Sequence, residues 1–157
     1  MIHCGLRIAD CFPVAASALI GCDMDKEEFS KRTFDFAVRC ARLTRALPKS
    51  DPVAREYGRQ LLRSSASVGA NYRAANRGRS RAEFIAKLGI VEEESDESLY
   101  WMDLLVATEC VKQKRITELR HEGVQILSMV VASINTARKN QNAGTTPHPQ
   151  FAIPNPQ

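Results

Sequence analysis

The chain has 157 residues and a formal net charge of +4, with 44% hydrophobic and 25% charged residues. This is the size and composition of a single globular domain with its own core, which excludes a disordered or fibrous chain. No uninterrupted run of about 18 apolar residues occurs, which excludes a long hydrophobic transmembrane helix.

The five cysteines are odd in number and form no Cys-x-x-Cys pair. This pattern favours reduced thiols in a cytoplasmic protein. It also provides no close pair of cysteines that could bind zinc. We expect Cys40 and Cys110 to be small buried hydrophobic residues. We expect no metal and no other cofactor.

Residues 1–23 are apolar and have no clear period, so we expect a poorly ordered or non-native extension, and the true start stays open between Met1 and Met24. The segment Leu19-Ile20-Gly21-Cys22 resembles a lipoprotein cleavage box, but Asp10 and Pro13 interrupt the apolar run before it. The domain is expected at residues 24–140. Residues 141–157 are rich in proline and polar residues and are predicted to be a disordered tail.

Two helices are predicted in the first half of the domain. Asp25 is a good N-cap for the first helix, which runs to about Ala46 and is stopped by Pro48. Its apolar positions recur at helical spacing: Phe29, Phe36, Cys40, Leu43 and Leu47. Asp51 and Pro52 begin the second helix, which runs to about Ala75 and has an inner side rich in small residues. Small residues allow helices to approach closely.

Two further helices complete the domain. Ser80 and Glu83 form a capping box that begins the third helix after a turn at residues 76–79. One seam of this helix repeats every 3.5 residues, as in helical bundles: Phe84, Leu88, Val91, Ser95, Ser98, Met102, Leu105 and Glu109. A second row lies beside the seam: Ile90, Glu94, Glu97, Trp101, Leu104 and Thr108. The fourth helix begins near Thr117 and ends between residues 138 and 140.

These elements predict an all-α protein, an antiparallel up-down-up-down four-helix bundle. Two packed faces on the third helix suggest one face for the domain and one for a neighbouring subunit. We therefore expect a ring-shaped homo-oligomer, with Ile90, Glu94, Glu97, Trp101 and Leu104 at the subunit interface.

Charge is distributed unevenly along the chain. Residues 49–87 carry nine basic and three acidic side chains, a net charge of +6, whereas residues 88–109 carry seven acidic and no basic ones. Arginines and an aromatic residue can hold phosphates and bases. This predicts a nucleic-acid-binding set of Arg63, Tyr72, Arg73, Arg77, Arg79 and Arg81. The alternative is that these arginines pair with the acidic run of a neighbouring subunit.

The sequence favours an interaction protein over an enzyme. Arg115 and His121 have the loose Arg-x5-His spacing of a class of helical ribonucleases, which keeps a ribonuclease as an alternative. Glu93 and Glu97, or Glu92 and Asp96, lie four residues apart, but no Glu-x-x-His partner for a metal site occurs. A purely structural oligomer is the third possibility. We expect neither a membrane nor a small-molecule substrate as partner.

Several short motifs carry a family resemblance between about residues 34 and 134: Gln60-Leu61-Leu62-Arg63, Ser67-Val68, Asn71, Arg79-Ser80, Glu83-Phe84-Ile85, Leu88 and Glu97. With these motifs the sequence resembles the bacterial four-helix-bundle proteins encoded by intervening sequences of 23S ribosomal RNA genes. Those proteins are similar in fold to the accessory variability determinant of diversity-generating retroelements.

The resemblance implies a homopentameric, barrel-like assembly. For the retroelement relatives it also implies binding of RNA or DNA and of a reverse transcriptase, whereas the intervening-sequence branch brings no settled activity. The segment Asn71-Tyr72-Arg73-Ala74-Ala75 replaces the family's Asn-Ile-Ala-Glu-Gly and gains an arginine.

Overall fold

The computed structural model describes residues 25–142, with side chains for residues 25–140. No strand occurs in this part of the chain, so the predicted all-α class is confirmed. The prediction for residues 1–23 lies outside the described residues, and so does that for the tail at 141–157 except at positions 141 and 142, which belong to the last helix. The helices are α1 (Lys26–Arg45), α2 (Pro52–Ala75), α3 (Arg81–Ala107) and α4 (Thr117–Asn142), with a short 3-10 helix, η3 (Gln113–Arg115), before α4.

Side-chain caps set the helix starts, as the sequence predicts. The Asp51 carboxylate accepts hydrogen bonds from the backbone N–H groups of Val53 and Ala54, at 2.8 and 3.3 Å. These bonds lower the pKa of Asp51. At α3, Ser80 Oγ accepts from the Glu83 N–H at 3.1 Å, and Glu83 Oε2 accepts from the Arg79 N–H at 2.9 Å. Each cap satisfies backbone donors that have no partner inside the helix.

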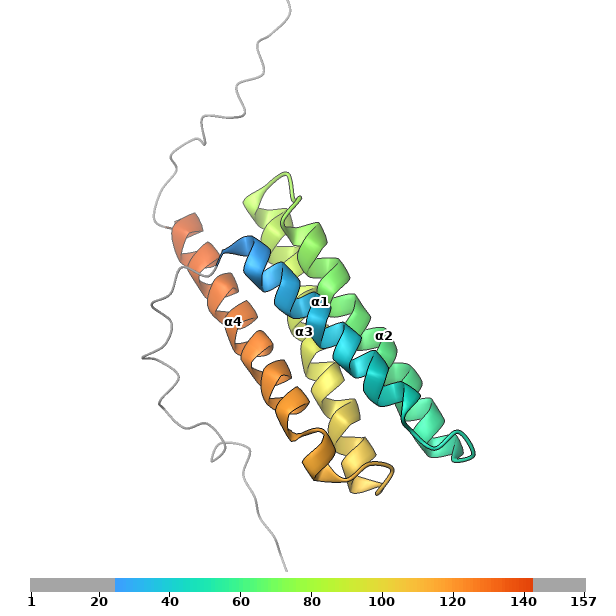
Figure 1. Ribbon diagram of the computed structural model, residues 1–157. Coiled ribbons are helices and arrows are strands. Elements are labelled where there is room, and N and C mark those ends of the chain that lie inside the picture. Colours follow the sequence, from blue (N-terminus) through green and yellow to red (C-terminus); the bar gives the residue numbers. More distant parts are fainter. Residues whose placement is uncertain (1–24, 143–157) are drawn as a thin grey trace, which may run out of the picture.

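The four helices lie side by side (Figure 1). The loops 46–51 and 108–116 lie at one end of the helices, and the loop 76–80 lies at the other. Helix α2 packs against α1 and α3, and α4 packs mainly against α3 and less extensively against α1. None of the described helices combines the length and hydropathy that crossing a bilayer requires.

The core is built from the apolar side of each helix. Its largest fully buried side chains include Phe36, Leu61, Leu88, Met102 and Ile126. Cys40 is also buried, and burial raises the pKa of its thiol to about 12, so it is an inert core residue as predicted. Cys110 differs from the prediction because it is only partly buried; its thiol lies 3.5 Å from Asp51 Oδ2.

Serines replace large side chains where α2 meets α3. Ser98 Oγ donates to Ser64 Oγ at 2.9 Å across the contact and lies 2.8 Å from the Glu94 carbonyl oxygen of its own helix. Ser65 and Ser95 donate to the carbonyls of Leu61 and Val91 at 2.7 and 2.6 Å. Among the described residues no buried side-chain polar atom lacks a partner. The polar middle of the α3 seam is therefore fully satisfied and lets the helices approach closely.

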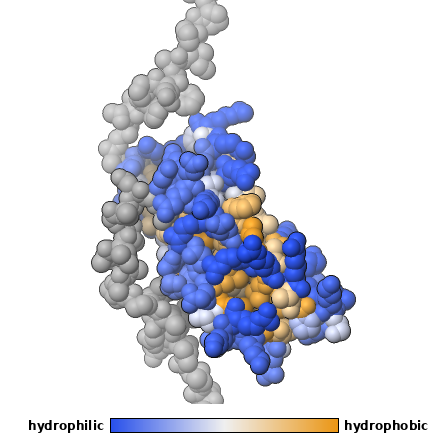
Figure 2. All heavy atoms as spheres, in the orientation of Figure 1, coloured by the Kyte–Doolittle hydropathy of each residue, from blue (hydrophilic) through white to orange (hydrophobic). Residues whose placement is uncertain are grey.

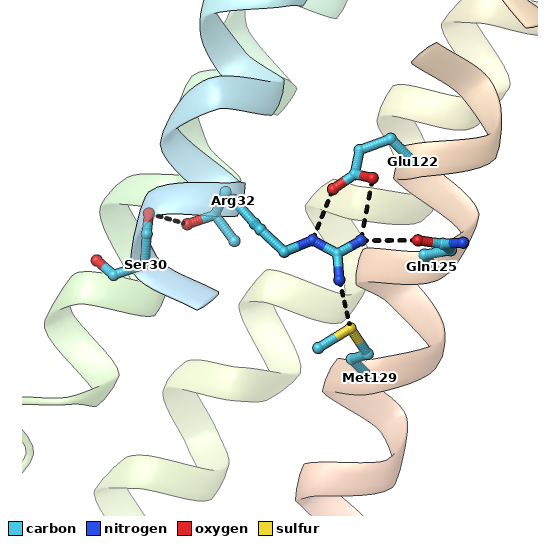
Figure 3. Close-up of polar contacts among 6 residues, drawn as sticks. Ser30, Arg32, Glu122, Gln125 and Met129 are labelled. Carbon is cyan, nitrogen blue, oxygen red and sulfur yellow. Dashed lines mark hydrogen bonds and ion pairs between the residues drawn. The ribbon is translucent and has the colours of Figure 1, made fainter. Parts of the chain in front are cut away.

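A charged side chain joins α1 to α4 (Figure 3). The Arg32 guanidinium donates to both carboxylate oxygens of Glu122, at 2.9 and 3.0 Å, and to Gln125 Oε1 at 2.7 Å. Its third nitrogen lies 3.4 Å from the Met129 sulfur. This planar, two-point contact fixes α4 against α1, where the helices share fewer other contacts.

Candidate nucleic-acid interface

The predicted arginines lie on α2 and at the turn into α3. Arg63 and Arg73 belong to α2, Arg77 and Arg79 lie in the turn after it, and Arg81 is the first residue of α3. All five are exposed. Most of this basic charge therefore lies near the C-terminal end of α2 and in the turn into α3.

None of the five arginines has an ion-pair partner within the part of the chain that the structure describes, and only Arg81 has a side-chain hydrogen bond there. Arg63, Arg73, Arg77 and Arg79 form no salt bridge there. Their situation differs from that of Arg59, which pairs with Glu56 at 2.7 Å three residues earlier on α2. The acidic run of α3 therefore does not neutralise them within one chain.

Arg81 has a structural contact. Its Nη1 donates to the backbone carbonyl of Asn140 at 2.8 Å, near the C-terminal end of α4. A guanidinium is favourable there because helix C-termini carry unsatisfied carbonyls and partial negative charge. Arg81 thus holds α4 beside the start of α3 and is exposed at the same time.

The prediction that Tyr72 contacts nucleic acid is wrong, because its ring is buried. Only 7% of the residue is exposed, and the ring packs edge-to-face against Phe29, with 4.6 Å between centroids. Burial also raises the pKa of its hydroxyl. The sequence places Tyr72 beside Arg73, but one residue along a helix turns the side chain by about 100°. The tyrosine thus points into the core while the arginine faces outward, so Tyr72 cannot stack on a base.

Phe34 on α1 is an aromatic residue of this surface that the sequence reasoning missed. It is 56% exposed, whereas Phe29 and Phe36 on the same helix are 5% and 1% exposed. Phe34 is not among the apolar positions that recur at helical spacing in the first helix. This mismatch was the sequence signal that could have predicted its exposure. It lines an open hollow of about 370 Å³ between α1 and α2 whose lining also includes Arg73 and Arg77. Figure 2 shows hydrophobic residues gathered in the middle of the face on which α1 lies, with hydrophilic residues around them.

The residues predicted for a subunit interface lie along the side of α3 next to α2. The Glu94 carboxylate accepts a hydrogen bond from Ser67 of α2 at 2.9 Å. The Trp101 ring lies 5.6 Å from that of Tyr57 of α2, and its indole N–H donates to Glu97 at 2.9 Å. Ile90, Trp101 and Leu104 are partly buried, and Glu97 is exposed. The row is therefore packed on α2 on one side and open on the other.

Comparison with known proteins identifies the family. The profile of the 23S rRNA-intervening sequence protein family matches residues 25–132. The chain belongs to this family. The chain is similar in sequence and structure to a solved protein with unknown function from the S23 ribosomal protein family of Bacteroides thetaiotaomicron. It is 32% identical, with a TM-score of 0.63, over 68% of this chain and 97% of that one. The comparison with curated proteins gives no match.

The match to the 23S rRNA-intervening sequence protein family covers every residue of the predicted basic set and of the predicted interface row. It also covers Arg115 and His121, the two residues of the ribonuclease alternative. Arg115 ends η3 and His121 lies in α4; both are exposed, and no hydrogen bond joins them in the described part of the chain. Among residues 25–140, no group of three metal-ligating side chains comes together.

Proposed function

We propose that this protein is a non-enzymatic interaction protein of the cytoplasm that binds nucleic acid, or a protein that processes nucleic acid. The observation that carries the proposal is the set of exposed arginines without an intramolecular ion pair: Arg63, Arg73, Arg77 and Arg79. Arg81 extends this surface onto α3. A guanidinium that is not neutralised by its own chain is free to contact a phosphate, and its planar fork suits that contact.

We further propose that antiparallel up-down-up-down bundles assemble into a ring, which the family resemblance makes a pentamer. The partly open row of Ile90, Glu94, Glu97, Trp101 and Leu104 supports this, because a partly exposed tryptophan and leucine gain by being covered. The acidic run beside the row keeps polyanions away from this face and leaves binding to α2 and the turn.

The experiment that tests the basic surface is a salt series of binding to labelled RNA and DNA. The double variant Arg77→Ala with Arg79→Ala is expected to weaken binding and to lower the salt slope by about two, because each phosphate contact releases about one counterion. The matched control is Arg42→Ala with Arg45→Ala, which removes the same charge from the other end of the bundle, in the last turn of α1.

If both double variants lost the same affinity for RNA and DNA, the loss would come from the lower net charge alone. That result would contradict a defined binding surface. An unchanged affinity in the Arg77 and Arg79 variant would remove these two residues from the contact set. If the variant changed the molar mass of the assembly and not the binding, the arginines would be pairing with a neighbour's acids. RNA cleavage that is lost with His121→Ala would contradict the non-enzymatic assignment.

A further inference from the structure

Phe34 is an exposed phenylalanine on an otherwise well-packed helix. More than half of its surface, 56%, is open, and the only described large hydrophobic residue with equal exposure is Tyr100. An exposed aromatic ring is common as a single feature. Phe34 differs because its exposed ring lies in a hollow beside arginines that have no ion pair. This combination needs an explanation.

Two adjoining hollows share the Phe34 side chain. The first, of about 370 Å³, has a lining of small residues between α1 and α2, including Ala37, Ala66 and Ala70. The second, of about 590 Å³, extends toward the start of α1, past Lys31. Phe34 and Arg73 line both. Because the neighbouring side chains are short, a flat group can reach the phenyl ring without displacing a large residue.

The charges around the ring favour an anionic ligand at one side. Arg73 and Arg77 line the first hollow, and neither forms a salt bridge within the described residues. Glu27 and Glu28 line the far end of the second hollow. A polyanion crossing Phe34 is therefore drawn along α2 toward Arg77 and kept from the start of α1. From Arg63 to Arg73 the helix rises by about 15 Å, and Arg77 lies just beyond its end, so the basic residues can follow a few nucleotides.

We propose that this surface binds single-stranded nucleic acid, with one unpaired base stacked on Phe34 and the flanking phosphates held by Arg73 and Arg77. This rests on the proposed nucleic-acid-binding function and narrows its ligand. An aromatic ring beside a basic track is the usual arrangement for binding a strand without sequence preference, because every base has a π face. The bases of an intact duplex are stacked on each other and cannot reach the ring.

The test compares a labelled single strand of about 12 nucleotides, without secondary structure, with the matched duplex, both by fluorescence anisotropy. Phe34→Ala is expected to weaken binding of the single strand by roughly 5- to 100-fold and to leave duplex affinity and the salt slope unchanged. Because the side chain is mostly exposed, the fold should survive, which circular dichroism checks. Phe34→Tyr keeps the ring and should retain most of the affinity.

Two further variants make the result decisive. Tyr100→Ala removes an aromatic residue of the same 56% exposure from the acidic side of α3 and should leave both affinities unchanged. Phe34→Leu keeps an apolar side chain without a π face and should bind the single strand almost as weakly as Phe34→Ala. If Phe34→Leu binds the single strand like the wild type, stacking is contradicted, because an apolar side chain without a π face is then sufficient.

The test separates the inference from the proposed function. If Phe34→Ala binds the single strand as well as the wild type while the Arg77 and Arg79 variant loses affinity, the stacking inference is overturned and the basic surface stands. If Phe34→Ala weakens single strand and duplex equally, selectivity for unpaired bases is overturned. If the wild type binds neither ligand, the proposed function and the inference are both overturned.

Discussion

The approach of α4 to the rest of the core depends on the absence of a side chain at position 123. A Cβ atom on Gly123 would lie 2.9 Å from the Leu99 Cδ2 atom and 3.2 Å from the Phe36 ring. Leu99 could rotate, but Phe36 is only 1% exposed and is held on all sides. Gly89 on α3 is the opposite case, because a Cβ atom there would meet nothing within 4 Å. Glycine is thus a packing requirement at one of these two positions and not at the other.

We expect Gly123→Ala to lower the free energy of unfolding by about 1–2 kcal/mol, because overpacking outweighs the better helix propensity of alanine. Gly89→Ala should raise it by up to about 1 kcal/mol, since only propensity changes. Urea unfolding followed by circular dichroism measures both. A stabilising Gly123→Ala would show that α4 can move away from Phe36 without loss.

The helices differ in how they are held together. The contact of α2 with α3 is extensive and includes satisfied serines and the Tyr57–Trp101 ring pair. The contact of α1 with α4 is weaker and depends more on the Arg32 guanidinium and its partner Glu122. These two side chains are 25% and 22% exposed, whereas the Arg59 and Glu56 pair within α2 is 62% and 51% exposed. Both pairs have two-point geometry, so the lower solvent screening of Arg32 and Glu122 makes the contact between the helices the stronger one.

A double-mutant cycle of Arg32→Ala and Glu122→Ala should give a coupling free energy of about 1 kcal/mol. The matched cycle of Glu56→Ala and Arg59→Ala should give a smaller value, because both side chains lie in water. Equal couplings in the two cycles would mean that the contact in Figure 3 is no stronger than a surface ion pair. Urea unfolding of the single and double variants gives both values.

Along α2, the turn and α3, the two kinds of charge are largely separated on the surface. The basic residues follow α2 and the turn, and the acidic residues follow the open side of α3 beside the predicted interface row. Leu104 belongs to that row and is partly exposed. Val53, at the start of α2, is a hydrophobic residue of 40% exposure outside it.

If the proposed ring forms through this row, Leu104→Arg should release the subunits, because a guanidinium would be buried in an apolar contact without a partner. Val53→Arg adds the same charge outside the row and should leave the assembly intact. Size-exclusion chromatography with light scattering measures the molar mass of each. A wild-type protein that is monomeric at micromolar concentration would contradict the ring, and an intact Leu104→Arg assembly would place the interface elsewhere.

Local signals in the sequence were sufficient for the fold class and the helix boundaries. Asp51 and Ser80 cap helices where the pattern predicts, and α3 buries Leu88, Ser95 and Met102 of the predicted seam. Caps and periodicity act over a few residues, so one short window of sequence contains the interaction that defines each helix start. Arg63 and Arg73 lie between the buried positions of α2, and Arg77 and Arg79 lie in the predicted turn.

The amino-acid sequence by itself therefore determined the helices and their ends, the uneven charge and the family motifs. Only the tertiary structure decided which aromatic residue faces solvent beside the arginines. Tyr72 is covered because Phe29 of α1 packs on its ring, and Phe34 is open because the facing residues of α2 are small. Both outcomes depend on how α1 lies against α2, a contact between residues about 40 positions apart, and no local pattern in either helix contains it.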